Sequence, residues 1–318
     1  NVKVPEITGK NYHLYPDEPL EDSLAEKMSE QPMNLEEGLP YNITVQGAAD
    51  FGSTKMFEQL NQIGRDHDPD THHILFFIHG NKTDLQVAFE TVRQLHKRYV
   101  ENDTCPIQEI VLFTWPAMKQ LLEYRDDAKD AIESGYALAR AFRKLKRFFS
   151  NIAHKIDCGE DHAFCEQKIH LMCHSMGNRV LESMFEELNS QRIRINSIFG
   201  EIFLLAADID YHAMEAPNAL YNLIEAGERI HIYYQNKDKA LGSSEHTMNS
   251  FNRLGRWGAK NTLSLPDDVF QANVTGVQEN YASLIDDWIN HWYYLNSDAV
   301  VQDIIHVING EDSLFDML

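Results

Sequence analysis

Short apolar runs alternate with amphipathic stretches along most of the chain. Six runs have the length of buried strands, at residues 74–78, 110–113, 169–172, 202–206, 230–234 and 269–274. Between and after these runs, apolar residues recur at helical spacing over 85–100, 126–152, 176–188 and 299–307. This alternation is typical of an α/β fold with a mostly parallel central sheet and helices on both of its faces.

The first 45 residues follow a different pattern. They carry many acidic residues and repeated prolines and show no sustained periodicity. We therefore predict an irregular acidic N-terminal extension over 1–45, with one short helix near residues 21–29. No linker rich in Pro, Gly or Ser interrupts residues 72–310, so we expect residues 46–318 to form a single domain.

The charge balance narrows the classes of partner. The chain has 28 basic and 49 acidic residues, a formal net charge of −21. Such a field repels phosphate groups, so we expect neither nucleic acid nor an anionic membrane surface as a partner. No apolar run approaches the roughly 20 residues that cross a bilayer, and we expect no transmembrane segment. The sequence carries no signature of an oligomeric state.

The four cysteines are too few and too scattered for a disulfide framework. No Cys-x-x-Cys pair occurs, and we predict neither a metal site nor a cofactor. The first residue is Asn rather than Met, so we expect the natural N-terminus to lie upstream. We expect a cytoplasmic protein, and a secreted or periplasmic location stays open because a removed signal peptide would leave such a start.

A sharp turn at Ser175 is the strongest chemical signal. Ser175 stands where a predicted strand turns directly into a predicted helix, and such a strained corner projects its hydroxyl above the sheet. Gly177, two residues after Ser175, leaves room for neighbouring backbone. Cys173, two residues before Ser175, stands where Gly is more usual. Taken alone, the pentapeptide leaves open that Ser175 only caps the helix.

A second signal lies upstream, where the first predicted strand ends in His79-Gly80-Asn81. In α/β-hydrolases the loop after that strand donates one N–H to the oxyanion, and the residue after the nucleophile donates the other. We therefore predict that Ser175 is a nucleophile and that the Asn81 and Met176 amides form its oxyanion hole. Gly80 lets the loop turn, and His79 is predicted to shape the loop rather than act as a base.

The acid of a hydrolase triad follows the nucleophile in this fold. Asp238 and Asp208 each come soon after an apolar run, at the edge where ligands bind in parallel sheets. We favour Asp238, because the acid of this fold usually follows the next-to-last strand. Asp208 stays open as the alternative acid, as a residue that structures its loop or as a contact on the substrate side.

Three histidines follow Asp238. His246 precedes the last predicted strand, and His306 lies within the final predicted helix. His291 lies between that strand and that helix, where the base belongs, although an aromatic core segment with an incidental histidine is the alternative. We predict that His291 takes the proton from Ser175 and that Asp238 orients the imidazole.

Seven short stretches carry a family resemblance, at residues 77–81, 113–116, 124–128, 173–180, 205–210, 238–241 and 291–293. With these motifs in this order, the chain resembles an uncharacterised family of α/β-hydrolases over about residues 70–310. The resemblance implies a serine hydrolase with the triad Ser175, Asp238 and His291, and it names no substrate. Family members more often carry Tyr where this chain has Asn81, and the acidic loop before His291 is unusually long.

The leading functional hypothesis is an esterase-like or lipase-like enzyme that cleaves a small-molecule or lipid-like carboxylic ester through an acyl-enzyme. An acyltransferase or a thioesterase would use the same triad. A different alternative is a catalytically idle hydrolase fold that serves as a protein-interaction module. The acidic extension and the loop before His291 motivate it, because added segments often carry partner contacts.

Overall fold

The computed structural model describes residues 11–14, 42–45, 60, 62, 70–117, 124–157, 168–247, 249, 251–277 and 289–315. The chain divides into two compact units, one of Asn1–His67 with Arg140–Cys165 and one of Asp68–Ala139 with Glu166–Leu318. The short helix expected near residues 21–29 lies outside the described residues, as does most of the loop before His291.

In the first unit, two short strands pair in parallel. They are β1 (Asn11–Leu14) and β2 (Asn42–Val45), and their register sets the first residues of the two strands opposite each other. Both strands belong to the segment for which we expected an irregular extension. That expectation and the domain boundary after residue 45 stay predictions, because most of the segment lies outside the described residues.

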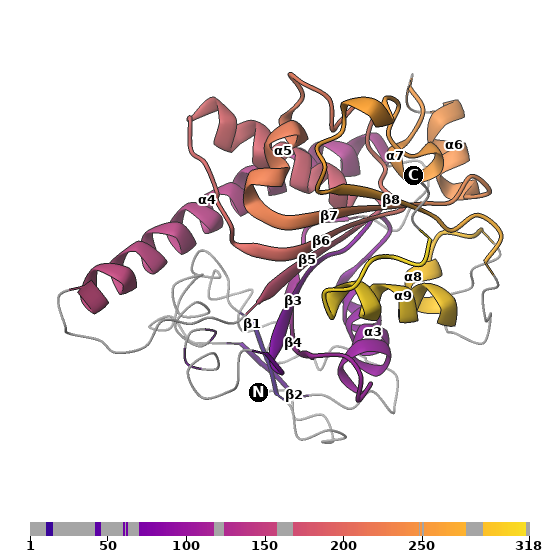
Figure 1. Ribbon diagram of the computed structural model, residues 1–318. Coiled ribbons are helices and arrows are strands. Elements are labelled where there is room, and N and C mark those ends of the chain that lie inside the picture. Colours follow the sequence, from indigo (N-terminus) through magenta and orange to yellow (C-terminus); the bar gives the residue numbers. More distant parts are fainter. Residues whose placement is uncertain are drawn as a thin grey trace. The chain divides into compact units, whose positions relative to one another are not determined.

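The second unit contains a six-stranded sheet in the order β4-β3-β5-β6-β7-β8, in which each neighbouring pair runs parallel (Figure 1). The strands are β3 (His73–Ile78), β4 (Ile107–Phe113), β5 (Ile169–His174), β6 (Phe199–Leu205), β7 (Gly227–Tyr234) and β8 (Val269–Asn273). All six apolar runs are therefore strands, and the predicted α/β class is confirmed.

Helices connect the strands, and α3, α8 and α9 lie on one face of the sheet while α5 lies on the other (Figure 1). The helices are α3 (Leu85–Leu95), η2 (His96–Val100), α4 (Tyr124–Asp157), α5 (Gly177–Ser190), η4 (Ala219–Ala226), α6 (Lys239–Thr247), α7 (Leu254–Trp257), η5 (Thr262–Ser264), α8 (Tyr293–Asn296) and α9 (Asp298–Ile308). In the part of the chain that the structure describes, none of them has both the length and the apolar character of a membrane-crossing helix.

Burial on both faces explains why the strands read as continuous apolar runs. Every residue of β3 and of β6 is buried, since helices cover both sides of these central strands. The predicted helix over 85–100 begins at Asp84, whose side chain accepts a hydrogen bond from Val87 N–H at 2.9 Å. It is α-helical as far as Leu95 and continues as one π-helical turn, η2.

The segment that carries His291 is anchored in the core beneath the sheet's carboxyl edge. Tyr293 is fully buried, donates its hydroxyl to Tyr233 C=O at 2.8 Å and accepts Ala206 N–H at 2.6 Å. The next residue, Tyr294, accepts the Tyr99 hydroxyl at its C=O at 2.8 Å. Because β6, β7 and η2 all hold this segment, its first residues have a fixed place at the ends of the strands.

Candidate active site

Ser175 lies at a tight corner between β5 and α5. Its φ of 52° is in the left-handed region, which costs a non-glycine residue free energy and persists only where neighbours enforce it. Ser175 N–H donates to Leu205 C=O at 2.9 Å, and Ser175 C=O accepts Asp208 N–H at 3.1 Å. The Asn178 amide reaches back from α5 to the same carbonyl at 3.0 Å. The corner is therefore tied to β6 and to its own helix.

Gly177 lets this corner pack against the end of β3. A Cβ atom at Gly177 would lie 2.6 Å from the carbonyl oxygens of both Ile78 and His79, closer than any side chain tolerates. Two residues before the corner, Cys173 is fully buried, and burial raises the pKa of its thiol well above the ordinary value. Its thiol is thus an uncharged packing group at the position where Gly is more usual.

Gly80 brings the loop after β3 directly against the corner. A Cβ atom at Gly80 would stand 2.9 Å from Ser175 Cβ and 3.1 Å from His174 Nδ1. The next residue, Asn81, accepts hydrogen bonds from Lys82 N–H at its side chain and from the Thr83 hydroxyl at its C=O. The loop assigned to the oxyanion hole therefore runs beside Ser175 in a turn fixed by its own side chains.

His79 is embedded in this loop. Its Nδ1–H donates to Gly80 C=O at 2.9 Å, and its Nε2 accepts Trp115 N–H at 3.2 Å and the Thr114 hydroxyl at 3.1 Å. The Trp115 indole stacks on the imidazole and donates to His79 C=O at 2.9 Å. Burial lowers the pKa of His79 to about 4, so the ring is neutral near pH 7. These contacts support the loop-shaping role that we predicted.

Met176 was predicted to provide the second amide of an oxyanion hole. It is the N-cap residue of α5, and the first N–H groups of a helix have no carbonyl one turn back to bond. The positive end of the helix dipole also lies here. Its neighbour Ser175 is only 7% exposed, so an anion at this corner would meet these amides with little competing water.

Asp238 and His291 form a short hydrogen bond. His291 Nδ1 lies 2.6 Å from Asp238 Oδ2, and both side chains are buried. The other carboxylate oxygen of Asp238 accepts Leu241 N–H at 2.9 Å, within the first turn of α6. The carboxylate is thereby locked in one orientation. A neutral imidazole that donates Nδ1–H to a carboxylate has its acceptor at Nε2, which is the arrangement of a catalytic base.

His291 also lies against the strand that ends at Ser175. The imidazole of His174, the last residue of β5, has its centroid 4.7 Å from that of His291. Its Nε2 lies 3.1 Å from His291 C=O. The structure therefore brings the predicted acid and base together and sets the base beside the residue that precedes Ser175. His306 instead pairs with Glu311 at 2.9 Å on α9, and His246 lies in the last turn of α6.

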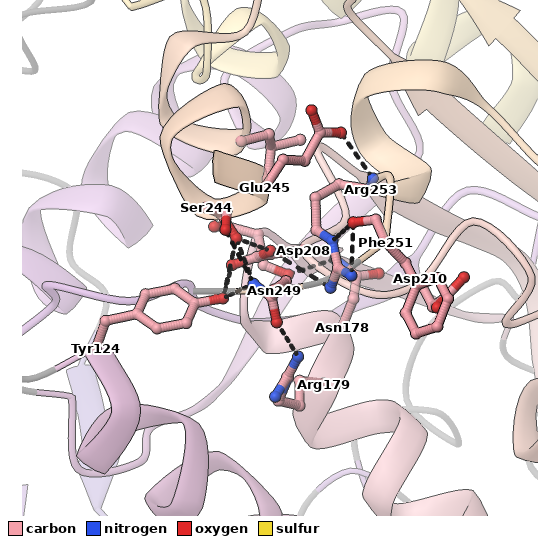
Figure 2. A network of polar contacts seen from close by, with 12 residues as sticks. Tyr124, Asn178, Arg179, Asp208, Asp210, Ser244, Glu245, Asn249, Phe251 and Arg253 are labelled. Carbon is pink, nitrogen blue, oxygen red and sulfur yellow. Dashed lines mark hydrogen bonds and ion pairs between the residues drawn. The ribbon is translucent and has the colours of Figure 1, made fainter. Parts of the chain in front are cut away.

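The alternative acid, Asp208, belongs to a separate polar network (Figure 2). Its two oxygens accept hydroxyl groups, from Tyr124 at 2.7 Å and from Ser244 at 2.7 Å. The Asn249 amide donates to both of these hydroxyls, and Arg253 Nη1 lies 4.0 Å from the carboxylate. Asp208 is thus engaged by hydroxyl groups and a cation, and its main chain holds Ser175 C=O.

Sequence reasoning missed this network and the role of Asn178. Tyr124 is partly buried, and its pKa is raised to about 12, first by desolvation and then by the negative charge of Asp208. Its hydroxyl therefore stays protonated and donates. Tyr124, Asn178 and Asp208 all lie in stretches that carry the family resemblance, and Asp208 was also a candidate acid because it follows an apolar run. Among the described residues, no group of three or more His, Cys, Asp or Glu side chains is arranged to hold a metal ion.

A family model described as an α/β hydrolase of unknown function (DUF900) matches residues 55–308. The chain is similar to the uncharacterised protein alr1448 of Nostoc sp. (strain PCC 7120), with 21% identity in a match that covers 73% of this chain and 70% of that protein. No solved structure matches the chain significantly. Because the family model spans well over half of the sequence, the chain belongs to this family of α/β hydrolases of unknown function.

Proposed function

We propose that this chain hydrolyses carboxylic esters through a covalent acyl-enzyme on Ser175. The observation that carries the proposal is the buried pair of Asp238 and His291, whose 2.6 Å hydrogen bond lies beside the corner that holds Ser175. An unassisted serine hydroxyl is a poor nucleophile, and a base with its ring held by a carboxylate activates it. Membership of a hydrolase family agrees with this chemistry.

The reaction proceeds in two steps. Ser175 Oγ attacks the ester carbonyl carbon while its proton moves to His291 Nε2, and the same proton then leaves with the alkoxide as the ester C–O bond breaks. In the second step a water molecule gives a proton to His291 and attacks the acyl carbon, which releases the acid and restores the Ser175 hydroxyl. Asp238 stays ionised and stabilises the imidazolium in both steps.

The Asn81 and Met176 amides hold the negative oxygen of each tetrahedral intermediate. A preorganised donor of this kind contributes about 3 kcal/mol to the barrier reduction in enzymes of this mechanism. His79 serves this step indirectly, because its neutral ring fixes the loop with three hydrogen bonds. A loop fixed before substrate arrives needs no reorganisation when the charge develops.

Acyl transfer and thioester cleavage are further uses of the same groups. They differ from ester hydrolysis in the acceptor of the second step or in the leaving group of the first. Competition between water and added alcohols or amines for the acyl-enzyme separates a transferase from a hydrolase. An idle fold that acts as an interaction module would form no acyl-enzyme at all.

The proposal is tested with a fluorophosphonate probe and with short p-nitrophenyl esters on the full chain. We expect labelling of the unmodified protein and ester turnover, and loss of both in Ser175→Ala. Ser190→Ala is a matched control, because Ser190 is exposed at the end of the same helix and bonds only its own helix backbone in the described structure. A folded protein that takes no label and turns over no ester would contradict the proposal.

A further inference from the structure

His174 lies between the two loops that the proposed reaction needs. It is the last residue of β5 and only 1% exposed. On one side its Nδ1 approaches Gly80, where an added Cβ would stand 3.1 Å away. On the other side its ring centroid is close to three rings of the base-bearing segment, at 4.7 Å for His291, 4.3 Å for Trp292 and 4.9 Å for Tyr294.

One hydrogen bond joins His174 to the base itself. His174 Nε2–H donates to His291 C=O at 3.1 Å, and both residues are buried. The pKa of His174 is well below its ordinary value, first through burial and then through the nearby His291 ring. His174 is therefore neutral with its proton on Nε2, and it donates to the carbonyl without placing a positive charge beside the imidazolium that forms on His291.

Two separate restraints thus act on His291. Asp238 holds the imidazole at Nδ1, and the hydrogen bonds of Tyr293 and Tyr294 hold the segment that follows. His174 holds the carbonyl of the same residue, and its own backbone is continuous with Ser175. A shift of β5 at this point would therefore move the nucleophile and the base together.

We infer that His174 is a positioning residue, which fixes the main chain of His291 at a set distance from Ser175. The inference rests on the proposed function, because it assigns the base its geometry relative to the nucleophile. His174 contacts neither the substrate nor the reacting atoms in this role. It acts through the carbonyl of the base, and its tilted ring contacts with Trp292 and Tyr294 carry the restraint into the core.

The inference is tested with three variants of the full chain. His174→Phe keeps a ring but removes the donor. His174→Gln and His174→Asn form a matched pair of amides, since only the longer side chain sets an N–H near the place of the imidazole Nε2–H. Should His174→Phe fail to fold by circular dichroism, the amide pair carries the comparison. His306→Gln, on the exposed side of α9, is the control for a histidine outside the site.

We expect His174→Phe and His174→Asn to lower kcat on p-nitrophenyl esters about 10- to 100-fold, with KM changed less than about threefold, because a small misplacement of a catalytic group slows chemistry more than binding. His174→Gln should recover kcat to within about threefold of the unmodified protein. Equal kcat in all three variants, or equal losses in the two amide variants, would overturn the inference.

A proton NMR measurement separates this inference from the proposed function. The Nδ1–H of His291, shared with Asp238, should give a strongly downfield resonance in the unmodified protein and in Ser175→Ala. We expect that resonance to broaden or vanish in His174→Phe and His174→Asn and to persist in His174→Gln. If it persists in all three, His174 does not position the base. If the protein takes no fluorophosphonate label while the resonance behaves as expected, the hydrolase proposal fails and the positioning role stands.

Discussion

Two aspartates lie near the same corner, and their partners set their roles. Asp238 has one oxygen on His291 and the other on Leu241 N–H, whereas Asp208 is held by two hydroxyl groups. A carboxylate that orients an imidazole must be free to accept its Nδ1–H, and hydroxyl donors on both oxygens compete with that task. This difference in partners is the physical reason to prefer Asp238 as the acid.

Replacing each aspartate with asparagine tests that preference. We expect Asp238→Asn to lower kcat roughly 10⁴-fold, because the amide favours the imidazole tautomer whose Nε2 carries the proton. The matched Asp208→Asn should keep kcat within about tenfold, since its side chain has no bond to the imidazole. Steady-state kinetics on a p-nitrophenyl ester check both values. A larger loss in Asp208→Asn than in Asp238→Asn would reverse the assignment.

The Tyr124 hydroxyl is one of two hydroxyl groups that donate to the buried side chain of Asp208 (Figure 2). We expect Tyr124→Phe to lower the free energy of unfolding by about 1–3 kcal/mol, because it removes a hydrogen bond to a buried charged group. Urea unfolding followed by fluorescence measures the change. Tyr136→Phe, on the exposed side of the same helix, is the control and should leave the unfolding free energy unchanged.

At the level of elements, the corner between β5 and α5 depends on close backbone approach. In Gly177→Ala the new methyl group would stand 2.6 Å from two carbonyl oxygens at the end of β3. We expect the corner to shift, with a loss of about 1–3 kcal/mol of unfolding free energy and a large loss of fluorophosphonate labelling. Gly276→Ala serves for comparison, because Gly276 has a positive φ but open space around it, and it should keep its labelling.

The strands and helices were predictable because their buried positions are apolar and form regular runs or stripes in the sequence. The run at 202–206 overlaps β6, which ends at Leu205, and the stripe over 126–152 lies within α4. The element ends were less accurate, since β4 begins at Ile107 rather than at 110, and the helix predicted over 85–100 changes to a π-helical turn after Leu95. Such ends depend on local hydrogen bonds, which apolar spacing does not record.

Contacts between distant segments were beyond the sequence. The bond from His174 to the carbonyl of His291 joins positions 117 residues apart, and the bond from Tyr124 to Asp208 joins positions 84 apart. No periodicity relates such positions, because only the order of strands in the sheet brings them together. Ser175 could still be predicted as the nucleophile, because the strand, the turn and the helix around it are adjacent in the sequence.

Across the whole molecule, buried neutral histidines couple stability to pH. Burial lowers the pKa of His79 to about 4 and that of His170 to about 3, against an unfolded value near 6.5. Below pH 6.5 these histidines bind protons in the unfolded chain but not in the folded protein. The unfolding free energy therefore falls as the pH falls toward their folded-state pKa values. We expect a loss of about 3 kcal/mol from His79 alone between pH 7 and pH 4.

Urea unfolding at several pH values between 7.5 and 4.5 measures this slope. His170→Gln should lower stability at pH 7.5, because it disturbs the 3.0 Å contacts of His170 with His73 and with Glu201 N–H. It should also make the unfolding free energy less dependent on pH, because the variant lacks one histidine that gains a proton on unfolding. His306→Gln is the control for a histidine outside the core, because that side chain is partly exposed on α9. An unfolding free energy that does not change between pH 6.5 and pH 4.5 would mean that these histidines gain protons as readily in the folded protein as in the unfolded chain. That result would contradict their burial as neutral rings.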